Sequence, residues 1–387
     1  MHIVKKQGRL PMADKKKCVV VTCFSENQPG FLDFSYRIQA LAEQYELIIL
    51  SQDVLTQAEL QVAGAEYIAI GRFHGKLGWL KYLWLAAGII RKNQPDVAVL
   101  LHSSAAPIVM MVGKIPTCLY WNEHPTNLIH LPDRGSLKSV LVKMLHKLVF
   151  IGAKRADVLM PIGEEHRDEL LHHGCNPRRL KMIYMGVDDK FASLPLIRSP
   201  EDALLLIYVG SISIPRGRDV MLQAIRIVAQ HHVPVKLTMV GAVPEELSFC
   251  QQFIREHQLE QYLEVLGRVP GNEIPSFLAQ ANAGICLWED KPWLRFNPPT
   301  KLFEYLVAGL PVLASDIRTH TRYIKNNENG IIFAYHPKTL ADAILALYKS
   351  RSRLPELSQN ASESGKVHLW SHIKPVFLNA VKEVEKA

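Results

Sequence analysis

The sequence predicts an α/β protein made of two doubly wound, Rossmann-like domains. Short runs of β-branched and aliphatic residues alternate with helical patterns, and the alternation restarts after a polar, proline-containing stretch at 185–203. Continuous apolar strands separated by helices are typical of parallel sheets that are covered on both faces. A chain of 387 residues also exceeds what one hydrophobic core usually supports. We therefore expect two domains, each with its own sheet.

The expected strands divide evenly between the two halves. The first domain, 1–192, is predicted to be completed by a carboxyl-terminal helix at 370–387, and the second spans 193–369. In open α/β sheets, ligands bind beyond the carboxyl ends of the strands, so functional residues should follow strands directly. The strands are expected at 18–24, 46–50, 66–70, 96–103, 117–121 and 157–162, then at 204–211, 235–241, 263–269, 283–288, 309–315 and 329–335.

Composition limits the class of protein and its partners. Hydrophobic residues make up 48% and charged residues 21%, which excludes a disordered or fibrous chain. The net charge of +8 favours an anionic partner: nucleotide phosphates, nucleic acid or an acidic lipid surface. The six cysteines form no CxxC pair, so we expect reduced, buried thiols rather than a disulfide or zinc framework.

Neither of two candidate targeting segments fits a membrane-spanning or secreted protein. The basic amino-terminal segment leads into a strand-like run instead of the apolar core of a signal peptide. The most apolar window, 77–90, is too short to span a bilayer and contains Lys81. We expect a soluble, cytoplasmic protein, with peripheral attachment to the inner face of the membrane as an open alternative.

The stretch "PPTKLFEYLVAGLPVLASD" at 298–316 predicts a helix whose amino end binds an anion. We expect Asn297 as the N-cap and Pro298 at the first helical position. Because the two prolines carry no N–H group, the free backbone donors are those of Thr300 and Lys301. The helix dipole and the lysine charge both favour a negative ligand at this end.

Glu304 is an unusual acid in an otherwise apolar helix. Four residues after Thr300, it can turn toward the same site, where a carboxylate accepts hydrogen bonds from sugar hydroxyls. An equally open alternative is a surface ion pair with Lys301 at i,i+3. Gly309 is expected to end the helix in a left-handed conformation, and Pro311 begins the exit.

A second stretch, "YVGSISIPRGRD" at 208–219, joins a strand to a helix through a short loop. A glycine directly after a strand, here Gly210, lets the backbone approach a phosphate. Arg216, just before Gly217, can clamp a diphosphate through two hydrogen bonds. The dinucleotide fingerprint GxGxxG is absent, so a plain loop is about as compatible with this stretch alone.

Taken together, the two stretches resemble the retaining GT-B glycosyltransferases of family 4, the group 1 glycosyl transferases. The second domain of that family has a glycine loop ending in KG or RG and a helix of the form "KlFEYmaaGkPViasd". Residues 208–217 and 301–316 match these motifs, and the likeness continues through 154–192, 265–270 and 328–334. The resemblance implies a GT-B fold, with two Rossmann-like domains that face each other across a cleft.

The resemblance also assigns a donor site. Arg216 and Lys301 would hold the diphosphate, and Glu304 would bind the ribose of the nucleotide. The base would contact 267–269, and the sugar would lie near 296–299. The remaining donor-site residues would be Gly210, Ser211, Gly217, Gly241, Gly267, Arg268, Val269, Asn297, Pro298, Thr300, Leu302 and Phe303.

Two positions depart from the family pattern. The first glutamate of its paired-glutamate motif falls at Phe296, which changes how the sugar is held. The basic residue that often follows the loop glycine is Ser211, which leaves more of the phosphate charge to Arg216.

The candidates for the catalytic region of the first domain are His102, Glu123 and His124. His102 lies at an expected strand end and matches a family histidine. A second family histidine, near the sugar, aligns with Asn122, followed by Glu123, and a short loop shift would bring His124 there. The alternatives remain open that His124 has no role and that His102 is only a hydrogen-bonded histidine at a buried strand end.

An early loop at 24–37 stands where the family has a glycine loop that approaches the donor phosphates and the acceptor. Gly30 is the matching residue, and the neighbouring Phe31 is an acceptor-groove candidate. Core packing explains aromatic residues at this spacing equally well.

Two acid-free stretches make the first domain strongly basic. No acid lies between Glu66 and Asp96 or between Asp133 and Asp157. Basic amphipathic helices with Trp and Leu suit an anionic membrane interface, whereas the alternative is solvated lysines on helices packed against the sheet. The residues are Arg72, Lys76, Lys81, Arg91 and Lys92 with Trp79, Tyr82 and Trp84, then Arg134, Lys138, Lys143, Lys147, Lys154 and Arg155 with Leu137, Leu141 and Leu145.

These observations predict a glycosyltransferase that moves a sugar from a nucleoside diphosphate sugar to a glycan or lipid-linked acceptor, in polysaccharide or glycolipid synthesis. The resemblance implies retention at the anomeric carbon and neither metal nor cofactor. No nucleic-acid partner is expected, because no nucleic-acid-binding motif is present. A non-catalytic scaffold that binds a nucleotide sugar and a same-fold epimerase remain as alternatives.

Overall fold

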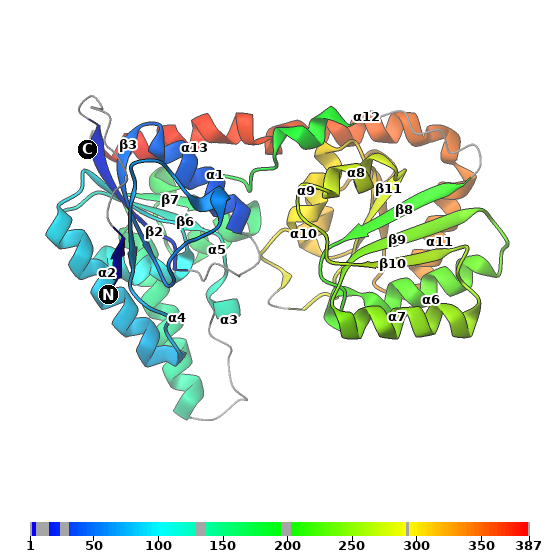
Figure 1. Cartoon of the computed structure of the whole chain (residues 1–387), viewed down its shortest axis with the longest axis horizontal. Coiled ribbons are helices and arrows are strands. Elements are labelled where there is room, and N and C mark those ends of the chain that lie inside the picture. The colour runs from blue at the N-terminus through cyan, green and yellow to red at the C-terminus, as the bar shows by residue number, and fades with distance from the viewer. Residues whose placement is uncertain are drawn as a thin grey trace. The chain divides into compact units, whose positions relative to one another are not determined.

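The computed structural model describes residues 2–4, 15–23, 31–128, 137–194, 203–291 and 294–385. The chain divides into two compact units, and Figure 1 colours the chain from its amino terminus to its carboxyl terminus. Unit 1 comprises Met1–Gly186 with Ile373–Ala387, and unit 2 comprises Val187–His372. The sequence placed these two changes of domain after residues 192 and 369.

Unit 1 is built on a seven-stranded sheet of order β1-β4-β3-β2-β5-β6-β7. All neighbours pair in parallel except β1, which runs antiparallel to β4 at the edge. The six predicted strands of this half are therefore present. The strands are β1 (His2–Val4), β2 (Lys16–Val21), β3 (Tyr45–Ser51), β4 (Glu66–Ala69), β5 (Val97–Leu100), β6 (Thr117–Trp121) and β7 (Val158–Pro161).

Helices return between these strands, as the alternating pattern predicts. The expected helices at 33–44, 77–92 and 136–154 correspond to α1, α2 and α4, each within two residues at either end. The carboxyl-terminal helix begins in unit 2, and its larger part belongs to unit 1. The helices are α1 (Phe31–Ala42), α2 (Gly75–Asn93), α3 (Pro125–Leu128), α4 (Leu137–Arg155), α5 (Glu164–His172) and α13 (Trp370–Val384).

Unit 2 is built on a six-stranded, fully parallel sheet of order β10-β9-β8-β11-β12-β13. All six strands expected in the second half are present, so the doubly wound fold is confirmed. The strands are β8 (Leu204–Val209), β9 (Val235–Ala242), β10 (Leu263–Gly267), β11 (Ala283–Cys286), β12 (Val312–Ser315) and β13 (Gly330–Phe333).

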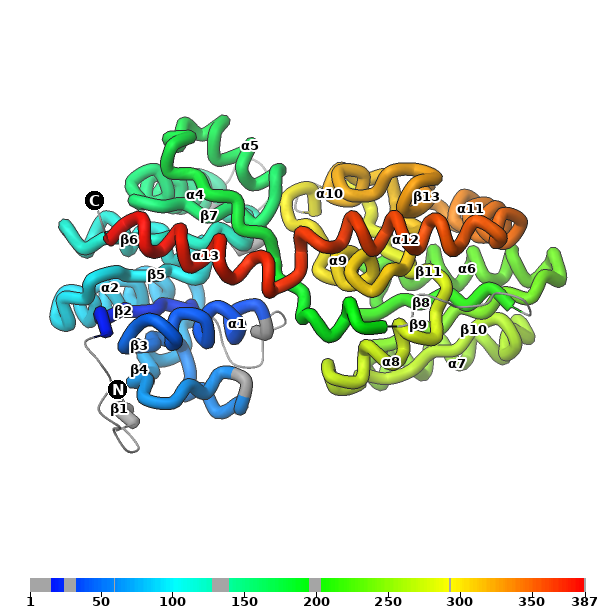
Figure 2. Tube along the Cα trace, turned by 90° about the horizontal axis from the view of Figure 1, so that it is seen from above, coloured from blue at the N-terminus to red at the C-terminus, as the bar shows by residue number. Residues whose placement is uncertain are grey.

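Two hydrophobic clusters cover the two faces of the unit 2 sheet. Side chains alternate along a strand, so Leu206 and Tyr208 pack with α6 and α11, while Ile207 packs with α9 and α12 on the opposite side (Figure 1). Figure 2 shows α9 and α12 side by side. The helices are α6 (Arg218–Ala229), α7 (Pro244–His257), α8 (Ile274–Ala279), α9 (Thr300–Val307), α10 (Arg318–Thr321), α11 (Pro337–Lys349) and α12 (Leu354–Gly365).

Each sheet has one point at which the order of strands reverses. In unit 2 this switch point lies between β8 and β11, and in unit 1 between β2 and β5. Ligands of open α/β sheets bind at the carboxyl ends of the strands beside such a point. The candidate site residues therefore have to be sought after β8 and β11 in unit 2 and after β2 and β5 in unit 1.

Two further expectations are addressed by the fold. All six cysteines are buried and free of disulfide bonds, as predicted. None of the described helices combines the length and the hydrophobicity that crossing a bilayer would require.

Candidate functional site

Two glycines form the floor of the carboxyl edge of the unit 2 sheet. Val209 pairs with Val240, which brings Gly210 beside Gly241. Both have positive φ angles, 128° and 123°, and a Cβ atom on Gly241 would lie 2.4 Å from the carbonyl oxygen of Gly210. Only glycine tolerates this conformation and this close approach. The absence of side chains at these two positions lets the two backbones approach each other and lets the Lys301 ammonium lie beside Gly210.

The amino end of α9 lies at the same edge, but its cap differs from the prediction. The N-cap is Pro299 rather than Asn297, and the helix begins at Thr300. A residue that precedes a proline is disfavoured in the helical region, so Pro298 stays outside the helix. The donors expected to remain free are unchanged, since the N–H groups of Thr300 and Lys301 make no backbone bond within the described residues.

Packing on the sheet fixes the direction of α9. The Tyr305 hydroxyl accepts the backbone N–H of Val209, the last residue of β8, at 2.8 Å. A Cβ on Gly284 would lie 2.3 Å from the Tyr305 ring, so this glycine lets the ring lie directly on β11. Gly309 ends the helix with a φ of 67°, as predicted. The helix therefore starts beside Gly210 because its buried face is anchored there.

Lys301 extends from α9 over the strand end. Its Nζ lies 3.6 Å from the centroid of the Tyr208 ring, and a Cβ on Gly210 would lie 2.9 Å from it. Burial lowers the pKa of Lys301 to about 7, and the nearby positive charge of Arg216 acts in the same direction. A partly buried ammonium beside a second cation favours an anionic ligand.

Arg216 approaches from the loop after β8, where 214–216 form a 3₁₀ turn. Its guanidinium carbon lies 4.9 Å from the centroid of the Trp288 ring, a cation–π distance. The Trp288 backbone is held in turn by the Ser315 hydroxyl, at 2.9 Å from both its nitrogen and its oxygen. Gly217 has a φ of 82° and leaves no room for a Cβ against Leu287.

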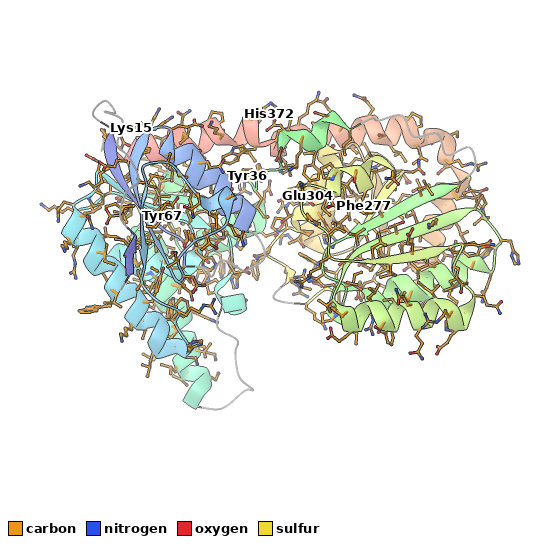
Figure 3. The ribbon with its side chains drawn as sticks, viewed as in Figure 1. Lys15, Tyr36, Tyr67, Phe277, Glu304 and His372 are labelled. Carbon is orange, nitrogen blue, oxygen red and sulfur yellow. The ribbon has the colours of Figure 1, made fainter. Side chains whose placement is uncertain are left out.

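Glu304 is partly buried on α9 (Figure 3). Burial raises the pKa of its carboxyl group to about 7, while Lys301 and Lys190 pull the pKa in the opposite direction. The carboxylate and the Lys301 ammonium form no ion pair in the described structure. The surface ion pair that remained open from the sequence is therefore not what holds Glu304.

The other predicted donor-site residues surround this centre. Gly267 ends β10, and Arg268 and Val269 follow it, with the arginine exposed. The Ser211 side chain is exposed, and its carbonyl oxygen accepts the Tyr208 hydroxyl at 2.9 Å. Leu302 and Phe303 bury their side chains, so only their backbone can contribute to binding.

Three aromatic residues of this site were missed by sequence reasoning: Tyr208, Trp288 and Tyr305. Tyr208 lies two residues before Gly210, on the face of β8 that carries Leu206. Trp288 lies two residues after Cys286, the last residue of β11. Tyr208 and Trp288 each lie near the end of a strand that flanks the switch point, but ordinary core residues share this pattern.

The assembled geometry can bind a diphosphate. It offers two cations, unused N–H groups at a helix start and a backbone without side chains. Among the residues that the structure describes, no cluster of His, Cys, Asp or Glu could hold a metal ion.

In unit 1, His102 follows β5 and caps the next turn. Its Nδ1 accepts the backbone N–H of Ser104 at 3.2 Å, so the ring proton resides on Nε2. Burial lowers the pKa of His102 to about 4, which keeps the ring neutral. A catalytic role for His102 stays a prediction, and its structural role is that of a hydrogen-bonded histidine at a strand end.

His124 follows β6 and, like His102, accepts the backbone N–H of the residue two positions later. Its Nδ1 accepts the backbone N–H of Thr126 at 3.3 Å, and its Nε2 lies 3.7 Å from a carboxylate oxygen of Glu169. His336, in the similar sequence His-Pro-Lys, caps α11 in the same way. The local sequence of His124 thus accounts for its position as a cap.

The residues before His124 connect the two loops of unit 1. The side-chain oxygen of Asn122 accepts the backbone N–H of Ser103 at 3.3 Å, which ties the loop after β6 to the loop after β5. Glu123, which lies between Asn122 and His124 in the sequence, is partly buried. The structure brings these candidates to one edge of unit 1, and their catalytic roles stay predictions.

The early glycine loop falls mostly outside the described residues. Gly30 is not described, and Phe31 is the first residue of α1, with a side chain that is likewise outside the description. The prediction for these two residues is unchanged.

Two family profiles match the chain. The profile described as "Glycosyl transferases group 1" matches residues 192–367, and "Glycosyltransferase Family 4" matches residues 36–191. Together they run without a break from residue 36 to residue 367.

Curated proteins with similar sequences are bacterial glycosyltransferases. The chain is 23% identical over 207 residues to the putative colanic acid biosynthesis glycosyltransferase WcaL of Salmonella typhimurium, with 52% of this chain and 49% of WcaL covered. It is 24% identical over 235 residues to the amylovoran biosynthesis glycosyltransferase AmsK of Erwinia amylovora, with 59% and 52% covered. The chain thus spans about half the length of these curated relatives.

Solved structures show the same fold over nearly the whole chain. Anabaena Alr3699/HepE in complex with UDP and glucose has a TM-score of 0.70 at 14% identity, with 96% of this chain and all of that chain covered. A glycosyltransferase from Rickettsia africae has a TM-score of 0.73 at 14% identity, with 97% and 100% covered. This likeness confirms the GT-B fold predicted from the sequence.

Proposed function

Because the chain belongs to the GT-B glycosyltransferases of group 1 and family 4, we propose that it transfers a sugar from a nucleoside diphosphate sugar to a glycan or lipid-linked acceptor. The anomeric configuration is retained, and the product serves cell-surface polysaccharide or glycolipid synthesis. Relatives named for colanic acid and amylovoran biosynthesis support this assignment.

One observation carries the proposal: Lys301 and Arg216 converge at the amino end of α9, over strand ends that have no side chains. Among the described residues, neither cation forms an ion pair with an acid of its own. Keeping two cations close together without a counterion is unfavourable, so the arrangement is explained by an anion that binds there. The leaving diphosphate of a sugar nucleotide is such an anion.

In the proposed reaction, the bond between the anomeric carbon and the diphosphate oxygen breaks as the acceptor oxygen bonds to the same face of that carbon. The proton of the acceptor hydroxyl passes to the leaving diphosphate oxygen. Lys301, Arg216 and the N–H groups of Thr300 and Lys301 stabilise the negative charge that develops on the leaving group. The residues of this site can do so without a metal ion, and Glu304 binds ribose hydroxyls rather than acting as a base.

We assign uridine as the base of the donor. Structural neighbours whose titles name UDP, UDP-glucose or UDP-2-fluoro glucose support this choice. The strands β8, β9 and β10 are neighbours in this order in the sheet, and Gly210, Gly241 and 267–269 lie at or near their carboxyl ends. The segment 267–269 is therefore the one furthest from Gly210. This position is expected for a base that is separated from the diphosphate by the ribose.

A thermal-shift screen against UDP, GDP, ADP and dTDP tests the donor first, because a ligand stabilises the protein in proportion to its occupancy. Radiolabelled transfer from the matching sugar nucleotides to a lipid extract then tests the reaction. We expect UDP to give the largest shift and release of UDP to depend on the acceptor.

Two results would contradict the proposal in distinguishable ways. Binding of UDP without acceptor-dependent release would indicate a non-catalytic scaffold. If no nucleoside diphosphate bound, the assignment of a donor site to unit 2 would be contradicted. Lys338→Ala, which removes an exposed lysine of unit 2 that pairs with Asp342, serves as the matched control for variants of Lys301.

A further inference from the structure

The outward faces of α2 and α4 form a surface that the donor site does not use. Both helices pack on the segment Ser103–Met110: the Trp79 ring N–H donates to the Ser104 oxygen, and a Cβ on Gly152 would lie 2.2 Å from the Ala106 oxygen. Both also contribute to one hydrophobic cluster on one side of the sheet. Their outward faces therefore point away from the same side of unit 1 (Figure 1).

The outward face of α2 mixes large apolar and basic side chains. Leu77, Lys81, Trp84 and Arg91 are all exposed and follow each other at intervals of four, three and seven residues, which places them on one helical face. Leu77 is 83% exposed and Trp84 64% exposed. Trp79 and Tyr82, which the sequence grouped with Trp84, are buried in the core instead.

The first half of α4 has the same character. Val140, Leu141 and Met144 are exposed, Met144 at 63%, and Lys143 and Lys147 lie exposed among them. The expected leucine face is not continuous: Leu145 is buried, whereas Leu141 is 48% exposed. Several large apolar side chains on two helices that both pack on Ser103–Met110 are more than the isolated exposed residues of an ordinary surface.

The charges of this surface are of one sign. Neither helix contains an acid, and none of their described lysines and arginines forms an ion pair. Exposed lysines of unit 2 behave differently, because Lys325, Lys338 and Lys366 each pair with an acid three or four residues away. The positive charge on α2 and α4 is thus available to an external partner.

The topology places this surface near the edge of unit 1 that carries the candidate residues. The strands are parallel, and each helix returns antiparallel to them, so the amino-terminal ends of α2 and α4 lie toward the carboxyl ends of the strands. The exposed apolar side chains concentrate in these amino-terminal halves. His102 and Asn122–His124 follow strands at the same edge.

We propose that α2 and α4 dock unit 1 on an anionic phospholipid bilayer. Trp84, Leu77, Leu141 and Met144 would enter the interface between headgroups and acyl chains, while the lysines contact lipid phosphates. A membrane at this face would present a lipid-linked acceptor close to the edge that carries His102. The docking surface goes beyond the proposed function and does not depend on it.

The charge contribution is tested by co-sedimentation with vesicles of phosphatidylcholine alone and of equimolar phosphatidylcholine and phosphatidylglycerol. We expect binding to the anionic vesicles only, and weaker binding at high salt. Reversing Lys81, Lys143 and Lys147 to Glu should reduce partitioning by at least roughly fivefold per residue. The control Lys325→Glu, Lys338→Glu, Lys366→Glu changes the net charge equally and should bind like wild type.

The apolar contribution is tested by Trp84→Ser with Met144→Ser. We expect this pair to weaken binding to anionic vesicles about tenfold or more, since both side chains lose their burial in lipid. Val367→Ser with Val376→Ser removes two exposed apolar side chains elsewhere and should have no effect. Brominated lipids should quench the fluorescence of wild type, and Trp84→Phe should abolish most of that quenching.

Three results would overturn the proposal: no binding to anionic vesicles, equal losses in both triple-charge variants, or binding indifferent to Trp84 and Met144. The last result, together with equal binding to a DNA oligonucleotide, would indicate a general polyanion surface. All variants alter exposed side chains, so an unchanged melting temperature verifies folding. An unchanged affinity for UDP in these variants shows that a loss of membrane binding does not result from damage to the donor site.

Discussion

The switch points of the two sheets are alike in topology and opposite in chemistry. In unit 2, Lys301 and Arg216 lie at a glycine edge and form no ion pair among the described residues, and the pKa of Lys301 is lowered to about 7 by burial and by Arg216. In unit 1, His102 is neutral and its Nδ1 is bonded to the backbone of its own turn. The first arrangement is the one on which the proposed donor site depends, whereas in the second His102 already has a hydrogen-bond partner in its own turn.

This difference teaches which residues can be recognised as functional from physical grounds alone. The crowding at Gly241 arises because the Gly210 backbone approaches it closely, and Gly210 in turn lies against the Lys301 ammonium. A histidine that caps a turn needs no ligand to explain it. Unit 2 therefore supports strong predictions about nucleotide affinity, and unit 1 supports weak ones.

The largest effect should come from Lys301→Ala. Removing a charged hydrogen-bond donor from the diphosphate should cost about 2–3 kcal/mol, or roughly 30- to 150-fold in affinity for UDP. Isothermal titration calorimetry measures this directly, with Lys338→Ala as the control. If the variant bound UDP as tightly as wild type, the switch point of unit 2 would not bind the diphosphate through Lys301, and the proposed difference between the two switch points would be contradicted.

Gly210→Ala should follow. The new Cβ would lie 2.9 Å from Lys301 Nζ, and the residue has a φ of 128°, which is strained for alanine. We expect about tenfold weaker UDP binding and a loss of about 1–2 kcal/mol in the free energy of unfolding. Chemical denaturation and calorimetry report the two quantities separately.

Gly88→Ala is the matched control for this change. Gly88 lies within α2, and an added Cβ meets nothing within 4 Å. Since alanine favours the helix, this variant should be as stable as wild type or more so. An equal loss of stability in both variants would mean that the conformation and surroundings of Gly210 do not explain the effect of Gly210→Ala.

The affinity for UDP should also depend on pH in a defined direction. Below about pH 7 Lys301 is already protonated in the free protein, and above about pH 7 its neutral amine must gain a proton as the diphosphate binds. Binding should therefore weaken as pH rises through about 7, by up to roughly tenfold per pH unit, with proton uptake near pH 8. Calorimetry in buffers of different ionisation enthalpy measures the uptake.

Two variants separate the contributions of Lys301 and Glu304 to this pH dependence. Lys301→Arg keeps a permanent charge and should remove the uptake that belongs to the lysine. Glu304, whose pKa is raised to about 7, becomes charged over the same range and opposes the diphosphate. Glu304→Gln should therefore remove the remaining part. If proton uptake persisted in both variants, another group would be responsible for the pH dependence of UDP binding.

The sequence was sufficient for the parallel strands and the order of elements, and it singled out Arg216 and Lys301, which the structure brings to the end of β8. The strands follow from periodicity, and residues such as Gly210 and Lys301 stand out because a buried sheet edge seldom needs a glycine or a lysine for packing. The sequence was wrong about the cap of α9, because the effect of Pro299 on Pro298 outweighed the capping preference of Asn297. The edge strand β1 was also missed, since three residues in a basic segment carry no clear strand pattern.

The aromatic supports of the site could not be predicted for a different reason. The roles of Tyr208 and Trp288 arise from contacts between segments that are far apart in the sequence, with Lys301 and Arg216 respectively. An aromatic residue at the end of a buried strand has the same sequence signature as an ordinary core residue. Only the fold distinguishes the two.

Trp288→Leu should therefore have a small but measurable effect. Leucine keeps most of the apolar packing and removes the ring face that holds Arg216, which is worth about 0.5–1 kcal/mol. We expect roughly threefold weaker UDP binding and little change in melting temperature. In the background of Arg216→Ala the same substitution should have no further effect on affinity, which a double-mutant cycle measures.

The smallest effect on nucleotide affinity should come from His102→Gln, in the other unit. Glutamine removes the imidazole, and the backbone N–H of Ser104 loses its acceptor unless the amide oxygen replaces it. UDP should bind as it does to wild type, because the diphosphate is held by groups of unit 2. Steady-state kinetics with donor and acceptor should show a lower kcat if His102 contacts the reacting sugar and an unchanged kcat if it is only a cap. A loss of UDP affinity would contradict the separation of the two switch points, because it would mean that the nucleotide itself is bound by both units.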